Sequence, residues 1–113
     1  MSDFDELVER YHLALAEFTK GDPEPTLTFF SHREDVSLGN PFGPFVRGWK
    51  QVSETASLAA THYKDGEAAS FDNIVKYVAS DVAYIAEVER YKARIGRSEH
   101  LTPVALRVTS VFR

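Results

Sequence analysis

The chain contains 113 residues, a length that fits one domain with its own hydrophobic core. Hydrophobic residues make up 43% and charged residues 27%, which is typical of a folded domain rather than of a disordered chain. The net charge of −4 provides no basic surplus, so we expect neither nucleic acid nor a membrane as a partner. The absence of cysteine excludes disulfides, thiolate nucleophiles and cysteine-ligated metals.

Neither the apolar runs nor the amino terminus resembles a membrane or export signal. No apolar run approaches the roughly 20 residues that cross a bilayer. The opening string MSDFDELVER is acidic and amphipathic, unlike a signal peptide. We therefore expect a cytoplasmic protein.

The first part of the chain has helical periodicity. Apolar residues recur at helical spacing from Phe4 to Phe18, and Gly21 supplies a stop signal for this helix. Pro23 predicts the first turn of a short second helix. The string VSLGNPFGPFVR, residues 36–47, predicts two short strands joined by a turn at 40–44. A third helix is predicted from about Trp49 to Tyr63.

The second half of the chain predicts three long antiparallel strands, because residues 67–79, 82–95 and 98–113 are rich in β-branched and aromatic residues. Pairing them about their turns places one set on the face that receives the helices: Phe71, Asn73, Val75, Tyr77, Tyr84, Ala86, Val88, Arg90, Val104, Leu106, Val108, Ser110 and Phe112. The opposite face then carries Glu87, Glu89 and Arg107 among Ile74, Val78, Ile85, Tyr91 and Val111. Helices followed by a bent antiparallel sheet define an α+β fold.

The order of these elements and several short strings resemble the NTF2-like superfamily, and within it the SnoaL-like and ketosteroid-isomerase-like proteins. The strings are Arg10–Tyr11, Gly21–Asp22, Arg33–Val36, Asn40–Gly43, Gly48 and Ala105–Thr109. The resemblance covers nearly the whole chain as one domain, 1–113, and implies a cone of helices on a strongly curved sheet. Members of the superfamily usually add one more strand, so either the sequence is shortened or the sheet ends on an exposed edge.

In ketosteroid isomerases of this fold, the resemblance implies a helix tyrosine and a protonated late-strand acid that bind the substrate oxyanion, and an aspartate that moves the proton. Tyr11 matches the tyrosine, whereas Asn40 takes the aspartate position and Ser110 the late acid position. An amide has no useful basicity near neutral pH, so the isomerase proton shuttle is expected to be missing.

The leading hypothesis is therefore a domain that binds a small apolar molecule in a conical pocket without a cofactor. Packing roles for Tyr11 and Trp49 and a turn role for Asn40 are the structural alternatives. Tyr11 is the one candidate catalytic group. The candidate ligand contacts are Tyr11, Asn40, Phe42, Trp49, Asn73, Tyr77, Tyr84, Arg90 and Ser110.

Two alternatives stay open. One is an enzyme acting on a steroid-like or polyketide-like carbonyl compound, with Tyr11 as oxyanion donor and Asp35 or His32 as the base if their loop turns inward. The other is a non-catalytic association module. All three hypotheses predict a homodimer, because the mixed sheet face exposes apolar residues. The histidines form no metal-binding spacing, so no metal site is expected.

Overall fold

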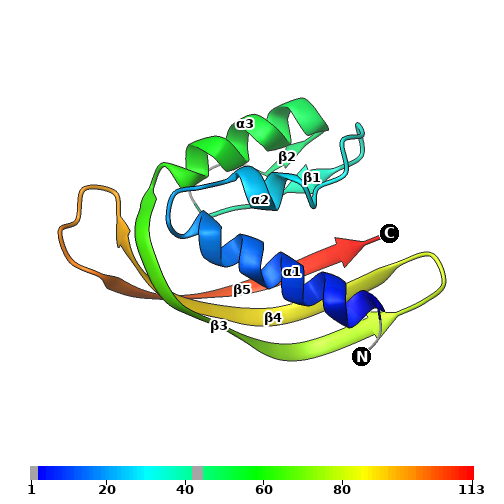
Figure 1. Ribbon diagram of the computed structural model, residues 1–113. Helices are drawn as coiled ribbons and strands as arrows, with labels where there is room; N and C mark the ends of the chain where they lie inside the picture. The colour runs from blue at the N-terminus through cyan, green and yellow to red at the C-terminus, as the bar shows by residue number, and fades with distance from the viewer. Residues whose placement is uncertain (1–2, 42–44) are drawn as a thin grey trace.

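The computed structural model describes residues 3–41 and 45–113 and places the helices inside the curve of a bent antiparallel sheet (Figure 1). The predicted α+β class is confirmed. In chain order the elements are α1 (Asp3–Phe18), α2 (Glu24–Leu27), β1 (Ser37–Leu38), β2 (Val46–Arg47), α3 (Trp49–Ala60), β3 (Tyr63–Val78), β4 (Ala83–Ile95) and β5 (Thr102–Phe112). No helix in these described ranges is long and apolar enough to cross a membrane.

The long strands form one sheet in the order β3-β4-β5, and β1 pairs with β2 in a separate two-stranded sheet. The sheet bends at the start of β3, where the pairing with β4 is interrupted by bulges on either side of Glu67. Gly66 lies in this bend. A Cβ at Gly66 would collide with the Thr19 side chain, so only glycine lets β3 pass this closely to the end of α1.

The predicted pairing of β3 with β4 is correct near their turn, where Tyr77 lies opposite Tyr84 and Val75 opposite Ala86. A third irregularity in β3 lies between Asn73 and Val75. The predicted partner of Asn73 was Val88, but Asn73 lies opposite Glu87. The bulge therefore moves β3 to the other face of the sheet at this point, because one extra residue reverses the alternation of side chains.

The predicted pairing of β4 with β5 is wrong by one residue. Val88 lies opposite Arg107 rather than Leu106, and Glu87 lies opposite Val108. Because side chains alternate, a shift of one residue turns every β4 side chain to the other face. The prediction for β5 itself is correct, since its helix-facing set remains Val104, Leu106, Val108, Ser110 and Phe112.

The buried face of β4 consequently carries two carboxylates that the sequence placed on the outside. The face toward the helices consists of Ala83, Ile85, Glu87, Glu89, Tyr91 and Ala93, each buried. The outer face carries Tyr84, Ala86, Val88 and Arg90, which are partly or largely exposed. Tyr84 and Arg90 therefore lie on the side of the sheet away from α1, and so does Tyr77, the partner of Tyr84.

Candidate functional site

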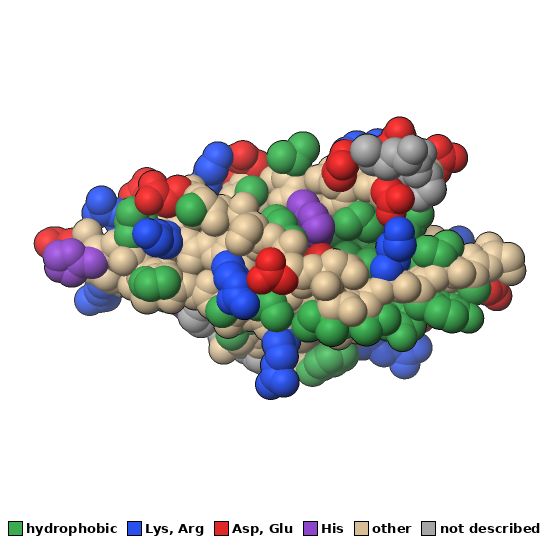
Figure 2. Space-filling view, turned by 90° about the horizontal axis from the view of Figure 1, so that it is seen from below, with side chains coloured by type: hydrophobic (Ala, Val, Ile, Leu, Met, Phe, Trp, Pro, Cys, Tyr) green, Lys and Arg blue, Asp and Glu red, His purple; other side chains and the backbone are tan. Residues whose placement is uncertain are grey.

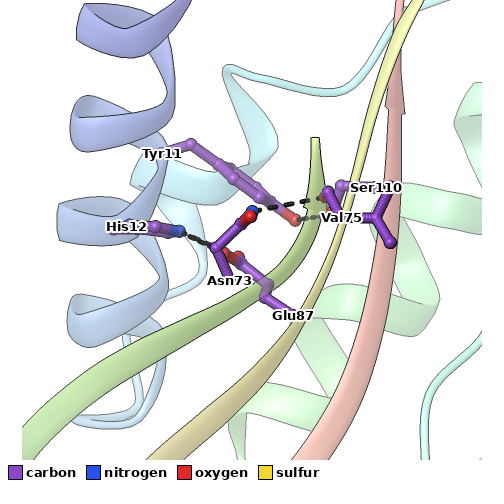
Figure 3. A network of polar contacts seen from close by, with 6 residues as sticks. All are labelled: Tyr11, His12, Asn73, Val75, Glu87 and Ser110. Atoms are coloured by element: carbon purple, nitrogen blue, oxygen red, sulfur yellow. Dashed lines mark hydrogen bonds and ion pairs between the residues drawn. The ribbon is translucent and has the colours of Figure 1, made fainter. Parts of the chain in front are cut away.

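Adjacent residues of α1 reach two different strands, and this brings polar groups together between the helix and the sheet (Figure 3). The Tyr11 hydroxyl lies 3.0 Å from Ser110 Oγ on β5, and either oxygen can be the donor. The prediction that Ser110 faces the helices is confirmed by this contact. Burial raises the pKa of Tyr11, an effect that outweighs the opposing hydrogen bond to Ser110. Tyr11 is therefore a hydrogen-bond donor rather than a base near neutral pH.

Aromatic rings surround the Tyr11 side chain. The ring of Phe112 on β5 meets it edge to face with the centroids 5.6 Å apart, and Phe29 lies at the same distance on another side. Phe4, which lies seven residues before Tyr11 on α1, packs edge to face on Phe112 with the ring centroids 5.4 Å apart. The hydroxyl pair thus sits in apolar surroundings, where a hydrogen bond is electrostatically stronger than in water.

The second polar contact joins His12 to Glu87 on β4. His12 Nε2 lies 2.8 and 2.9 Å from the two Glu87 carboxylate oxygens. The Glu87 side chain is 1% exposed, whereas the His12 side chain is 23% exposed. Phe71 of β3 stacks flat on the His12 ring, with the centroids 3.8 Å apart and the planes 2° from parallel. The histidine ring is therefore held by the Glu87 carboxylate at one edge and by the Phe71 ring against its face.

This contact also sets the chemistry of the imidazole. An ionised carboxylate only accepts hydrogen bonds, so Nε2 is the nitrogen that donates to Glu87. In a neutral ring Nδ1 then carries the lone pair and is able to accept a proton. Glu87 stabilises the imidazolium that results, because the two charges would lie in direct contact. The pair has the composition of a general base with its orienting group.

Glu89 is a third acidic group near this site. It follows Glu87 by two residues, so the two side chains share the buried face of β4, and Glu89 is 6% exposed. Burial, and then the charge of Glu87, raise the pKa of Glu89 to about 7. No side-chain hydrogen bond or ion pair reaches Glu89 from the part of the chain that the structure describes. Glu89 therefore keeps its proton to a higher pH than an exposed glutamate does.

His12, Glu87 and Glu89 were not among the site residues predicted from the sequence. His12 directly follows Tyr11, but a single histidine on a helix gives no chemical signal of its own. The two glutamates alternate with Val88, so their facing direction depends entirely on strand register. A sequence signal does exist in Ile85 and Tyr91, which flank the glutamates at the same alternation and favour burial of that face.

The remaining predicted contacts are dispersed. Asn73 shares the inner face with Glu87 but is exposed, and its amide donates to the Val75 carbonyl at 3.3 Å (Figure 3). Asn40 is half-buried in the loop after β1. Trp49, at the start of α3, stacks on His32 with the ring centroids 3.7 Å apart. Phe42 lies outside the described residues.

The two bases considered for the enzyme alternative have other contacts. His32 is exposed and lies against Trp49. Asp35 forms an ion pair with Arg113 at 2.7 Å, and this hydrogen-bonded partner lowers the pKa of Asp35. Neither contact involves Tyr11, whose polar neighbours are Ser110, which its hydroxyl contacts directly, and His12, the next residue on α1.

Two surface hollows lie apart from these polar contacts. One, of about 300 Å³, lies over β4 and β5 and is bordered by Arg90, Lys92 and Pro103 among others. The other, of about 290 Å³, lies between α1 and α2 and includes Leu13 and Phe29. Neither hollow is lined by Tyr11, His12, Glu87 or Ser110. Across residues 3–41 and 45–113, no group of three His, Asp or Glu side chains is placed to bind a metal.

Comparison with known proteins identifies the fold. No protein-family model matches the chain, and no curated protein matches its sequence. Among solved structures, the chain is similar to a Streptomyces avermitilis protein reported as a candidate dehydratase from the NTF2-like family. The two share 20% sequence identity and superpose with a TM-score of 0.71, over 96% of this chain and 86% of the other. The chain therefore has the NTF2-like fold, as its sequence predicted.

Proposed function

We propose that the chain is an enzyme that transfers a proton on a small, largely apolar carbonyl compound, in an elimination or isomerisation reaction. The observation that carries this proposal is the contact of His12 with the buried Glu87 carboxylate, next to the Tyr11–Ser110 pair. In this proposal His12 on α1 supplies the base that Asn40 cannot provide. The reported candidate dehydratase activity of the structural neighbour is consistent with this class of reaction.

In the proposed reaction His12 Nδ1 removes a proton from the carbon next to the carbonyl group. The electron pair of that C–H bond moves toward the carbonyl oxygen and forms an enolate. Tyr11 donates a hydrogen bond to this oxygen, with Ser110 holding the phenol in place. The imidazolium, stabilised by Glu87, returns the proton to another carbon or to a leaving hydroxyl group.

Access to the site is proposed at the flank where β3 leaves α1. His12 is partly exposed there, and the β3 residues on that side, Asn73 and Lys76, are exposed as well. Lys76 Nζ is bound to Asp5 of α1 at 2.9 Å, and both side chains are open to solvent. Opening this exposed contact costs little, since surface ion pairs contribute about 0–1 kcal/mol.

The test uses exchange with solvent, because it detects proton transfer before the product is known. The protein is incubated in D₂O with a panel of small enones, β-hydroxy ketones and cyclic ketones, and mass spectrometry measures deuterium at the carbon next to the carbonyl. We expect His12→Gln to lower the exchange rate by about 10²–10⁴-fold and Tyr11→Phe by about 10²-fold. His100→Gln, in the exposed β4–β5 turn, is the matched control and should exchange like the parent.

A second candidate function is ligand binding without chemistry. It is supported by the amide at Asn40 and the hydroxyl at Ser110, where the resemblance to ketosteroid isomerases implies acids. In that case the panel compounds bind, and Tyr11→Phe weakens binding, while no compound gains deuterium. Equal exchange by the parent and by folded His12→Gln and Tyr11→Phe proteins would eliminate the proposed enzyme.

A further inference from the structure

Glu89 is a buried acid to which the proposed reaction assigns no role. It shares the inner face of β4 with Glu87 and is 6% exposed. Glu87 accepts hydrogen bonds from His12, whereas no side-chain hydrogen bond or ion pair joins Glu89 to any residue that the structure describes. Burying a polar group without a partner costs free energy. A group of this kind is therefore a candidate for contact with a ligand.

The surroundings of Glu89 keep its carboxyl neutral. Across the sheet it lies opposite Phe71 of β3 and Leu106 of β5, which are both apolar. Burial, and then the charge of Glu87 on the same strand face, raise the pKa of Glu89. The other groups whose pKa values respond to its charge are phenols, those of Tyr11, Tyr63 and Tyr91. The Glu89 carboxyl thus holds a proton that it can donate.

The polar groups follow one another along the sheet in the order that an elimination needs. The Tyr11 hydroxyl meets Ser110, whose cross-strand neighbour on β4 lies two residues before Glu87. His12 meets Glu87 itself, and Glu89 lies two residues after Glu87. The order is therefore oxyanion donor, base and acid. In a β-hydroxy ketone the carbonyl oxygen, the C–H bond beside the carbonyl group and the hydroxyl group follow in the same order.

From this order we propose that Glu89 is the general acid of a dehydration, and that the substrate is a β-hydroxy ketone with a largely apolar body. The inference rests on the proposed function and adds a second proton-transfer group to it. His12 Nδ1 takes a proton from the carbon between the carbonyl group and the carbon that carries the hydroxyl. The electron pair forms a C=C bond, the C–O bond breaks, and Glu89 gives its proton to the departing oxygen. The products are an α,β-unsaturated ketone and water.

A second proton-transfer group is useful because hydroxide is a poor leaving group. The departing oxygen needs a proton while the C–O bond breaks. His12 Nε2 is bound to Glu87, and its Nδ1 faces the carbon from which it takes the proton. Glu89 is a separate donor on the same side of the sheet and is protonated before the reaction begins. After the product leaves, the imidazolium proton passes to the Glu89 carboxylate, and both groups return to their starting states.

The groups around His12 favour an apolar substrate. The His12 side chain is 23% exposed, and Phe71, which lies opposite Glu89, stacks on its ring at a centroid distance of 3.8 Å. Figure 2 shows a histidine side chain at the molecular surface with hydrophobic side chains on either side. A substrate that enters past His12 therefore meets apolar groups before its hydroxyl group reaches Glu89.

The experiment separates the base step from the acid step with two matched ketones. A β-hydroxy-β-phenyl ketone measures dehydration through the absorbance of its enone product, and the same ketone without the hydroxyl group measures deuterium exchange in D₂O. We expect Glu89→Gln to lower dehydration about 10²–10⁴-fold more than it lowers exchange. Glu89→Asp keeps the acid and should lose less, whereas His12→Gln lowers both rates. Glu99→Gln, at an exposed glutamate in the β4–β5 turn, is the matched control and should behave like the parent.

A change of leaving group tests the proton transfer itself. An acetoxy group departs as acetate and needs no proton, so parent and Glu89→Gln are expected to eliminate it at rates within about tenfold of each other. A structural role of Glu89 would lower the elimination of both leaving groups alike. Equal deficits for the two leaving groups, or a parent that exchanges deuterium but does not dehydrate the hydroxy ketone, would overturn this inference alone. A parent that exchanges no deuterium would overturn the proposed function as well.

Discussion

Both faces of β4 depart from the usual distribution of polar and apolar side chains. The inner face buries Glu87 and Glu89, whereas the outer face leaves Tyr84 exposed beside Tyr77. A buried carboxylate is tolerated where a partner offsets the loss of water, as His12 does for Glu87. An exposed aromatic pair is tolerated in a monomer, but it favours association. The polarity of a strand position therefore identifies its face only when the register is known.

The largest effect is expected from breaking the buried pair. His12→Ala leaves the Glu87 carboxylate buried without its hydrogen-bond donor, and we expect the free energy of unfolding to fall by about 3 kcal/mol. Urea denaturation at pH 7 measures this change. Lys20→Ala is the control, because it removes an exposed ion pair with Glu17 and should cost less than about 1 kcal/mol. Similar losses in the two variants would show that the buried His12–Glu87 contact stabilises the fold no more than an exposed ion pair does.

The second prediction concerns pH and the unpartnered inner carboxyl. Glu89 has its pKa raised from 4.5 to about 7 in the folded state. The unfolded chain releases this proton first, so the stabilising contribution is full below pH 4.5 and is lost as the pH rises through about 7. Glu89→Gln removes this dependence. Relative to the parent, the variant should gain about 3 kcal/mol between pH 4 and pH 8.

Denaturation curves for the parent and for Glu89→Gln at several pH values measure this difference. Glu67→Gln is the matched control, because Glu67 is an exposed glutamate on β3. Its stability should follow the parent at each pH. Parallel pH profiles for the parent and Glu89→Gln would refute a raised pKa at this position.

The smallest effect is expected on the outer face. Tyr77 and Tyr84 stack across two strands on the solvent-exposed face, and such aromatic pairs contribute about 0.5–1.5 kcal/mol. A double-mutant cycle with Tyr77→Ser and Tyr84→Ser, measured at a protein concentration that keeps the chain monomeric, gives the coupling energy. A coupling energy larger than the cost of His12→Ala would contradict the expectation that the inner contact stabilises the fold more than the outer pair does.

Much of the fold follows from local pattern. The periodicity from Phe4 to Phe18 matches α1, and Gly48 precedes α3 with a φ of 89°, a conformation that favours glycine. The three long strands occur where β-branched and aromatic residues are concentrated. The pairing of Tyr77 with Tyr84 was also predictable, because the short 79–82 turn fixes the register close to it.

The candidate site was predicted only in part. Tyr11 and Ser110 were expected on one interior, and their hydroxyls lie 3.0 Å apart. His12 and Glu87 were missed, because Glu87 was assigned to the face that meets solvent. That assignment followed the regular alternation of β3 through Asn73 and Val75, where the structure has a bulge.

The elements, their order and the fold class could be predicted from the sequence, since these depend on periodicity, turns and residue preference over short distances. The buried face of β4 could not, because it depends on contacts between residues far apart in the chain. Both faces of that strand mix apolar and charged residues, so local preference does not distinguish them. The choice depends on the bulge in β3 and on the fit of α1, where one histidine meets the carboxylate that would otherwise be costly to bury.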